Sequence, residues 1–315
     1  LQSRTFSPAP SGNVTIHAAD SIQMDGLSPT TNAFNVIATA TFFTSGASAP
    51  PVKTGRSGNL TVSTRQLMMR DGSYIAATSF GDAPAGDLKL NADSVELVGG
   101  ATQTPVNDVT TGLISVGYRR GNSGTISLNT RTLQLTDGGT ISTTHLGSGN
   151  AGSVTINASE SIQLASQIGG RYSNISSTLG SLTFNRQFYN VRELVTGNAG
   201  DVTVNTPSLR LDYAGVGVGN YGIGAAGTLK INADSIRLVN GGRVSASTFS
   251  GEGGNIKLQA QTLILRNLSE IATDANSSGN GGNITISAPF IVGLGNSNII
   301  ANAEEGRGGN IQITT

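Results

Sequence analysis

The chain has 315 residues, with 19 Lys and Arg against 19 Asp and Glu, 43 Gly and neither Cys nor Trp. This charge balance excludes a generally basic nucleic-acid-binding protein and an acidic disordered tail, so no nucleic-acid partner is expected. Without cysteine there is no disulfide framework and no thiolate metal site. The longest apolar run, Phe290–Leu294, is far shorter than the ~18 residues of a membrane span, and Leu1–Arg4 lacks the apolar core of a signal peptide. We expect a soluble part of a longer chain with no membrane span.

A short pattern recurs along the whole chain: Gly, a small or polar residue, and then apolar, polar and apolar residues. It starts at Gly12, Gly58, Gly86, Gly124, Gly152, Gly200, Gly227, Gly254, Gly282 and Gly309. Most spacings are 27 or 28 residues, and the three longer ones are 38, 46 and 48 residues. The longer units predict insertions near 26–52, 99–112 and 166–197, each beginning after the second strand of its unit. Internal repeats of this length are typical of solenoid proteins.

Each unit predicts three short strands. In the unit at Gly227, apolar and polar residues alternate through Leu229–Ile231 and again through Ile236–Leu238, and Asn240–Gly242 leads into a third run. Alternation over such short runs, bounded by Gly and Asn, is typical of strands. One coil of three strands cannot bury a core alone, so it must stack on its neighbours. We therefore predict an all-β, right-handed parallel β-helix, a single domain over 1–315 with nine to ten coils.

Stacking turns repeat positions into columns along the rod. Five residues after the repeat glycine, Asn stands at Asn91, Asn129, Asn157, Asn205 and Asn232, and stacked amides can hydrogen-bond along such a column. Slightly further on, the first five coils carry charges of alternating sign: Asp20, Arg65, Asp93, Arg131 and Glu160. We expect Arg65 between Asp20 and Asp93, and Arg131 between Asp93 and Glu160, because like charges at this spacing would repel.

Two motifs suggest chemistry but have plainer explanations. Gly217–Gly222 has the spacing of a dinucleotide-binding loop, but a strand pattern follows it where that chemistry needs a helix. His17 and His145 fall in different columns and lack partners at the spacing of a metal site or a catalytic triad. We therefore expect no metal and no cofactor.

A carboxylate pair is the strongest catalytic candidate. Asp25 and Asp71 both lie thirteen residues after their repeat glycine, so they could face each other about one strand spacing (~4.8 Å) apart. Each is followed by Gly, as are Asp137 and Asn240 in the same predicted column, and Asx-Gly is favoured in turns that need a positive φ. The turn explanation is preferred, and the chain is expected not to be an enzyme.

The insertions concentrate the aromatic residues. Segment 26–52 holds Phe34, Phe42 and Phe43, and segment 171–192 holds Tyr172, Phe184, Arg186, Phe188, Tyr189 and Arg192. Aromatic residues together with Arg are favoured at recognition surfaces, so segment 171–192 is the candidate binding loop for a cell-surface glycan or protein. Alternatively, the aromatic residues only pack the long loops onto the rod.

Segments Asp137–Thr144, Gly152–Leu164 and Ser250–Ile256 resemble repeats of the filamentous haemagglutinin family, and more narrowly those of long repeat exoproteins of cyanobacteria. The resemblance covers Gly12 to Thr315. It implies a right-handed β-helix passenger, exported through an outer-membrane two-partner transporter, that is extracellular or on the cell surface and acts in adhesion. No secretion domain with its asparagine-rich motifs is recognisable, so the chain would be a shaft portion. The alternatives are a polysaccharide-cleaving β-helix enzyme and a structural surface-layer component.

Overall fold

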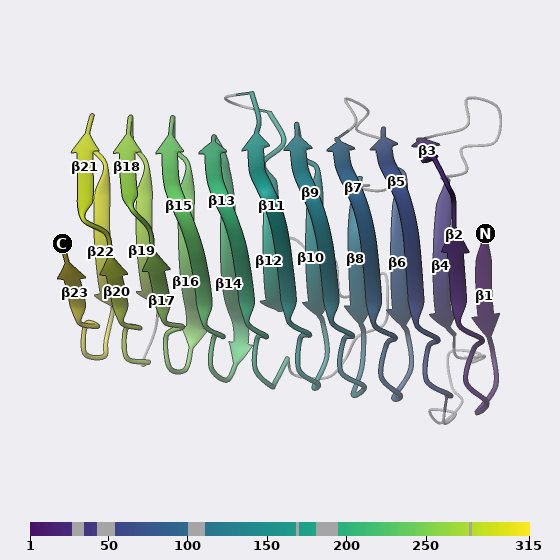
Figure 1. Cartoon of the computed structure of the whole chain (residues 1–315). Helices are drawn as coiled ribbons and strands as arrows, with labels where there is room; N and C mark the ends of the chain where they lie inside the picture. Colours follow the sequence, from purple (N-terminus) through teal and green to yellow (C-terminus); the bar gives the residue numbers. More distant parts are fainter. Residues whose placement is uncertain (27–34, 43–53, 100–110, 168–169, 181–194, 277–278) are drawn as a thin grey trace.

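The computed structural model describes residues 1–26, 35–42, 54–99, 111–167, 170–180, 195–276 and 279–315. These residues form strands and turns and no helix. The strands lie in two sheets that run along a rod, with the two termini at opposite ends (Figure 1). Neighbouring strands in each sheet are parallel and come from successive coils. The chain is a parallel β-helix, which confirms the fold predicted from the repeat.

One sheet takes a single strand from each coil. Its order is β1 (Gln2–Thr5), β4 (Val36–Thr41), β6 (Tyr74–Ser79), β8 (Gly112–Gly117), β10 (Thr140–His145), β12 (Ser173–Leu179), β14 (Ala214–Ile223), β16 (Arg243–Ser250), β19 (Glu270–Ala275) and β22 (Asn298–Ala303). The other sheet has the order β2 (Val14–His17), β5 (Leu60–Arg70), β7 (Leu88–Val98), β9 (Ile126–Thr136), β11 (Val154–Ala165), β13 (Val202–Asp212), β15 (Leu229–Val239), β17 (Ile256–Gln259), β20 (Ile284–Ser287) and β23 (Ile311–Thr314). It also includes β3 (Ser21–Asp25) beside β5, and β18 (Thr262–Arg266) between β15 and β21 (Phe290–Leu294).

The first two predicted strands of a unit are separate only in the coils near the two ends. In β5, β7, β9, β11, β13 and β15 they form one continuous strand that bends in the middle. In β7 the bend follows buried Ala92, where Asp93 and Ser94 both lie toward solvent before Val95 is buried again. Pairing with β5 skips Arg65 and Asp93 at this point. Two successive outward residues thus turn the chain without a break in the sheet.

The main core is an apolar column inside the rod, and Leu179, Val195 and Ala199 form a small separate cluster. The inward positions of β5 and β7 hold Leu60, Val62, Leu67 and Met69 in one coil and Leu88, Leu90, Val95 and Leu97 in the next, all buried. Burial of such side chains stabilises by about 1.5–3 kcal/mol each, so every coil depends on the apolar faces of its neighbours. This is the physical reason that the alternating pattern recurs in each unit.

The repeat glycine marks the closest approach of neighbouring coils. A Cβ on Gly86 would lie 1.9 Å from the carbonyl oxygen of Gly58, and a Cβ on Gly152 would lie 2.0 Å from that of Gly124. The same overlap holds for Gly58, Gly124, Gly200, Gly227, Gly254, Gly282 and Gly309. Because any side chain would collide with backbone, only glycine fits this column.

Two coils contain one extra residue at the bend. In the first coil, His17 faces Ser63 but Ser21 faces Gln66, so four residue steps match three on the partner strand. In β11, Asn157 faces Asn129 but Ser161 faces Thr132, which again matches four steps with three. Such a bulge shifts every later residue of its strand by one position.

The two longest predicted insertions each contain a strand of the helix. Strand β4 lies within 26–52, between residues 27–34 and 43–53, and β12 lies within 166–197, between 168–169 and 181–194. Only in the unit at Gly86 do the extra residues, 100–110, all precede the third strand. In these two units the extra residues therefore lie on both sides of the third strand.

Candidate functional site

The five predicted ladder asparagines lie in one column at the bend of the long strands. Asn129 donates its side-chain N–H to Oδ1 of Asn91 at 2.9 Å, and Asn157 donates to Asn129 at 2.9 Å. Asn205 donates to Asn157 at 2.8 Å, and Asn232 donates to Asn205 at 2.6 Å. Each inner amide thus donates to the preceding coil and accepts from the next, which fixes their register.

The five charged residues lie beside this column. Arg65 forms an ion pair with Asp20, and Arg131 contacts both carboxylate oxygens of Glu160 at 2.9 and 3.0 Å. The hydrogen bond that Arg131 donates to Glu160, with a smaller contribution from the charge of Asp93, raises the pKa of Arg131. The residues of both pairs are largely exposed, so solvent screens the two pairs and each contributes little to stability.

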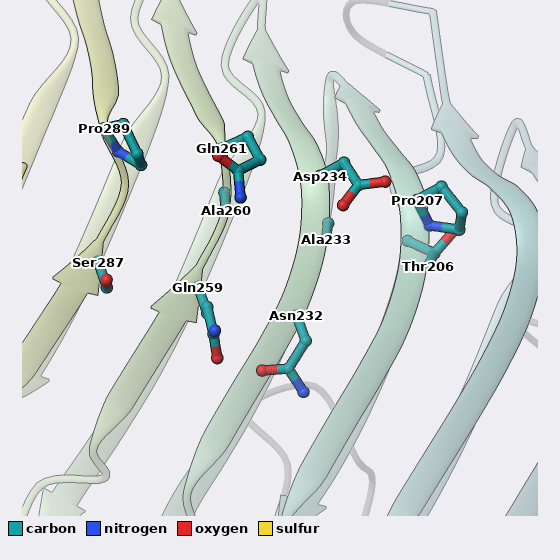
Figure 2. Close-up of a pocket in the computed structure, with 10 residues that line it drawn as sticks. All are labelled: Thr206, Pro207, Asn232, Ala233, Asp234, Gln259, Ala260, Gln261, Ser287 and Pro289. Carbon is teal, nitrogen blue, oxygen red and sulfur yellow. The ribbon is translucent and has the colours of Figure 1, made fainter.

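Two shallow hollows lie along the bend, one over the first coils and one over the later coils, and we call them together the bend groove. Figure 2 shows the C-terminal one. The lining residues there are Thr206, Pro207, Asn232, Ala233, Asp234, Gln259, Ala260, Gln261, Ser287 and Pro289. Asp234 is the one ionisable group among them, so this part of the bend groove offers hydrogen bonds but no acid and base pair for catalysis.

The predicted carboxylate pair is not in register. Because the first coil has its extra residue at the bend, Asp25 faces Arg70, and Gly26 packs against Asp71. Asp71, Asp137 and Asn240 have φ values of 53°, 49° and 51°, as a turn explanation requires, whereas Asp25 ends a strand with no positive φ. The shared column proposed for Asp25 and Asp71 was therefore wrong.

The two histidines lie apart. His17 ends β2 at the exposed start of the amide column, and His145 is buried at the end of β10. Nε2 of His145 accepts the backbone N–H of Gly149 at 2.7 Å. Among the described residues, no three His, Asp or Glu side chains gather as metal ligands.

A second polar ladder was missed from the sequence. Oδ1 of Asn13 accepts the backbone N–H of Asn59 at 2.8 Å, and Oδ1 of Asn59 accepts that of Asp87 at 3.0 Å. Asn283 receives the backbone N–H of Asn310 at 2.9 Å in the same way. The sequence signal for this ladder is the Asn or Asp that recurs directly after the repeat glycine. Its side-chain oxygen accepts a backbone N–H of the next coil.

An aromatic stack follows the first four strands of the sheet that begins with β1, namely β1, β4, β6 and β8. Phe6, Phe42, Phe80 and Tyr118 have ring centroids 5.1, 4.8 and 4.4 Å apart in that order. Phe42 was assigned to an insertion, but it directly follows β4 and belongs to this stack. The common offset from the third strand could have identified it.

Of the six candidate residues in the predicted binding loop, Tyr172 alone is described. Phe184, Arg186, Phe188, Tyr189 and Arg192 lie outside the described residues. Tyr172 directly precedes β12, and its ring meets Tyr213 edge to face at 5.7 Å. Burial raises the pKa of its phenol to about 12.

Tyr172 also borders a hollow of about 220 Å³ on the outer face of β12, β14 and β16. We call it the β14 hollow. Its lining includes Tyr172, Asn174, Ser176, Thr178, Gly215, Gly217, Gly219, Tyr221, Arg243, Ser245 and Ser247. The glycines that suggested a dinucleotide loop therefore lie on a strand, where two of them line this hollow.

Comparisons with protein-family models, curated proteins and solved structures found no match for the chain. Within the described residues, no helix is long and apolar enough to cross a membrane.

Proposed function

We propose that this chain is a non-catalytic shaft segment of a secreted or surface-attached adhesin. The observation that carries the proposal is the unbroken stacking of coils from β1 to β22, with polar and charge-balanced columns on the outside. Such a rod holds a fixed length and direction, since each coil adds one strand spacing of ~4.8 Å. A scaffold of this kind suits the presentation of a contact surface away from a cell.

The repeat resemblance extends this proposal. The repeats of the filamentous haemagglutinin type support export by two-partner secretion, with an outer-membrane transporter as the export partner. The location would then be extracellular, and the adhesive partner a glycan or protein on another cell. These assignments follow from the resemblance of the repeats.

Adhesion can be measured with beads coated with the whole chain and incubated with glycan-bearing cells. We expect the coated beads to attach to cells above the level of albumin-coated beads, while no reducing sugar is released from neutral or uronate polysaccharides. Attachment no greater than that of albumin would contradict the adhesive function.

Sugar release would favour an enzyme if it depended on Asp71. The matched variants are Asp71→Asn and Asp137→Asn, because both residues have a positive φ that Asn tolerates. Cleavage lost in Asp71→Asn and retained in Asp137→Asn would replace the adhesin proposal with a hydrolytic one.

A further inference from the structure

We propose that the β14 hollow binds one uncharged sugar residue of a glycan, between the rings of Tyr172 and Tyr221. This deepens the adhesive function proposed above and rests on it for its biological role. A shaft needs no ligand of its own. The site would therefore add ligand recognition to a segment that otherwise only holds other parts of the protein at a distance.

The floor of the hollow is bare backbone. Gly215, Gly217 and Gly219 occupy successive outward positions of β14. The facing residues of β12 are Asn174, Ser176 and Thr178, and those of β16 are Arg243, Ser245 and Ser247. Side chains are thus missing from one strand and present on both neighbours, which leaves a trough about 10 Å across from β12 to β16.

Glycine is a costly choice at these positions. Gly in place of Ala within a strand costs ~0.5–1 kcal/mol per residue, so glycine at three successive outward positions needs a reason. Glycine within a strand often marks the close approach of a ligand or of another backbone. Among the described residues, the atoms nearest to a Cβ on Gly217 belong to Ser245 of the neighbouring strand, and those nearest to a Cβ on Gly219 belong to the Tyr221 ring. No described segment crosses the floor there.

Two aromatic rings close the ends of the trough. A Cβ on Gly215 would lie 2.8 Å from Cε1 of Tyr172, and a Cβ on Gly219 would lie 3.4 Å from Cε2 of Tyr221. The rings therefore lean over opposite ends of the floor, and Gly217 lies between them. The two residues are 38% and 36% exposed, so part of each remains accessible.

The lining suits a polyhydroxylated ring. The tyrosine rings present apolar surface to sugar C–H groups, while the Ser and Thr hydroxyls and the Asn174 amide both donate and accept hydrogen bonds. A volume of about 220 Å³ is smaller than the ~300 Å³ or more of sites for drug-sized ligands. The hollow therefore has room for a single ring with the rest of the glycan outside.

Charge selects the class of sugar. Arg243 is the one cation in the lining, and it already pairs with Glu270 at 3.0 Å and with Asp274 at 3.3 Å. With two carboxylates for one guanidinium, the local net charge is negative. A uronate, sialate or phosphate group would be repelled, so the ligand is a neutral sugar.

The test is binding of the whole chain to a panel of immobilised neutral oligosaccharides built from glucose, galactose, mannose and N-acetylglucosamine, with uronate oligosaccharides beside them. The decisive variant is Gly219→Val, which fills the floor yet suits strand geometry and has no backbone clash. Its control is Gly293→Val, on strand β21, where nothing lies within 4 Å of an added Cβ. We expect Gly219→Val to weaken binding of the best neutral sugar at least ~10-fold, and Gly293→Val to leave it unchanged.

Removal of an aromatic wall gives an independent measurement. Tyr221→Ala should weaken binding by about three- to tenfold, the worth of one aromatic contact, whereas Phe290→Ala removes an exposed ring elsewhere and should have no effect. Thermal unfolding of each variant checks that the rod is intact.

Several outcomes would overturn the site. These are no binding of any neutral sugar by the wild-type chain, tighter binding of uronates, or full binding by a folded Gly219→Val protein. If the wild-type chain attaches to cells but binds none of the neutral sugars, the β14 hollow is not a sugar site and the adhesin proposal still stands. If it binds a neutral sugar but coated beads do not attach to cells, the adhesive role fails and the site remains.

Discussion

The imidazole of His145 occupies the space beside Gly117, where a Cβ would lie 2.5 Å from Nδ1 of the ring. The ring is buried and held by the Gly149 N–H, so it has little freedom to move aside. We expect Gly117→Ala to lower the free energy of unfolding by about 1–3 kcal/mol, the usual cost of overpacking. Gly293→Ala, made in open space, should be neutral or slightly stabilising. Urea denaturation followed by circular dichroism compares the two, and equal midpoints would contradict the packing argument.

The amide column predicts a local loss of stability. Asn157 lies in its middle and makes one bond to Asn129 and one to Asn205. Asn157→Ala removes both, and we expect a loss of about 1–2 kcal/mol in the free energy of unfolding. Thr155→Ala, two residues earlier on the same outward face, is the matched control and should cost less. A smaller loss for Asn157→Ala than for Thr155→Ala would show that the amide bonds add nothing.

The charge column predicts an effect that salt weakens. Arg131→Glu would place a third carboxylate beside Asp93 and Glu160, so we expect a loss of stability at low ionic strength. The double variant Arg131→Glu with Glu160→Arg restores an opposite pair and should recover most of it. Denaturation midpoints at low and high salt measure both effects. A loss that is independent of salt and not recovered by the swap would assign Arg131 a packing role.

The buried phenol of Tyr172 predicts that the stability of the fold falls at alkaline pH. Burial raises the pKa of its phenol to about 12, whereas a tyrosine in the unfolded chain titrates near ~10. The neutral phenol is favoured in the folded state, so its contribution to stability is complete below pH ~10 and is lost as the pH rises through about 12. Tyrosinate absorbance should show one late-titrating group that is missing in Tyr172→Phe. Identical high-pH titrations of the two proteins would contradict this assignment.

Residues 181–194 can be removed to restore a regular coil. Leu179 faces Asn220 and Thr196 faces Ile223, and the next coil spans this interval with only Tyr221 and Gly222. Deletion would leave Gly180 and Val195 in the same two places. We expect the shortened chain to keep its strand content and to melt within a few degrees of the wild type. A collapsed circular-dichroism signal would mean that the deleted residues are needed for the fold.

The architecture could be predicted from the sequence because every coil of a solenoid must satisfy the same packing requirements. The glycine column, the inward alternation through residues such as Leu88 and Leu90, and the Asn column all recur with one period, so each coil supports the same prediction. The five ladder asparagines could be aligned by counting from the repeat glycine, because no extra residue intervenes before them.

Counting failed where one coil departs from the others. The extra residue at the bend in β11, and that between β2 and β3, cannot be recognised from the spacing between repeat glycines. Both units also contain a long insertion, which lengthens the same spacing. This is why Asp25 was placed opposite Asp71 and not Arg70. The β14 hollow was missed for a related reason. In the sequence, Gly215 and Gly217 resemble turn residues. The hollow that they leave becomes visible only when the polar side chains of β12 and β16 are placed on either side of them.

The direction of the bonds between coils has a mechanical consequence. They run along the rod, so tension applied at its two ends loads all the bonds of one coil interface at the same time. In the middle, one coil pairs with the next through both β11–β13 and β12–β14, whereas the terminal strands β1 and β23 each pair with one neighbour through four residue pairs. The terminal strands therefore bear the greatest load per bond. Under a steady pull we expect them to detach first, while the central stack stays whole.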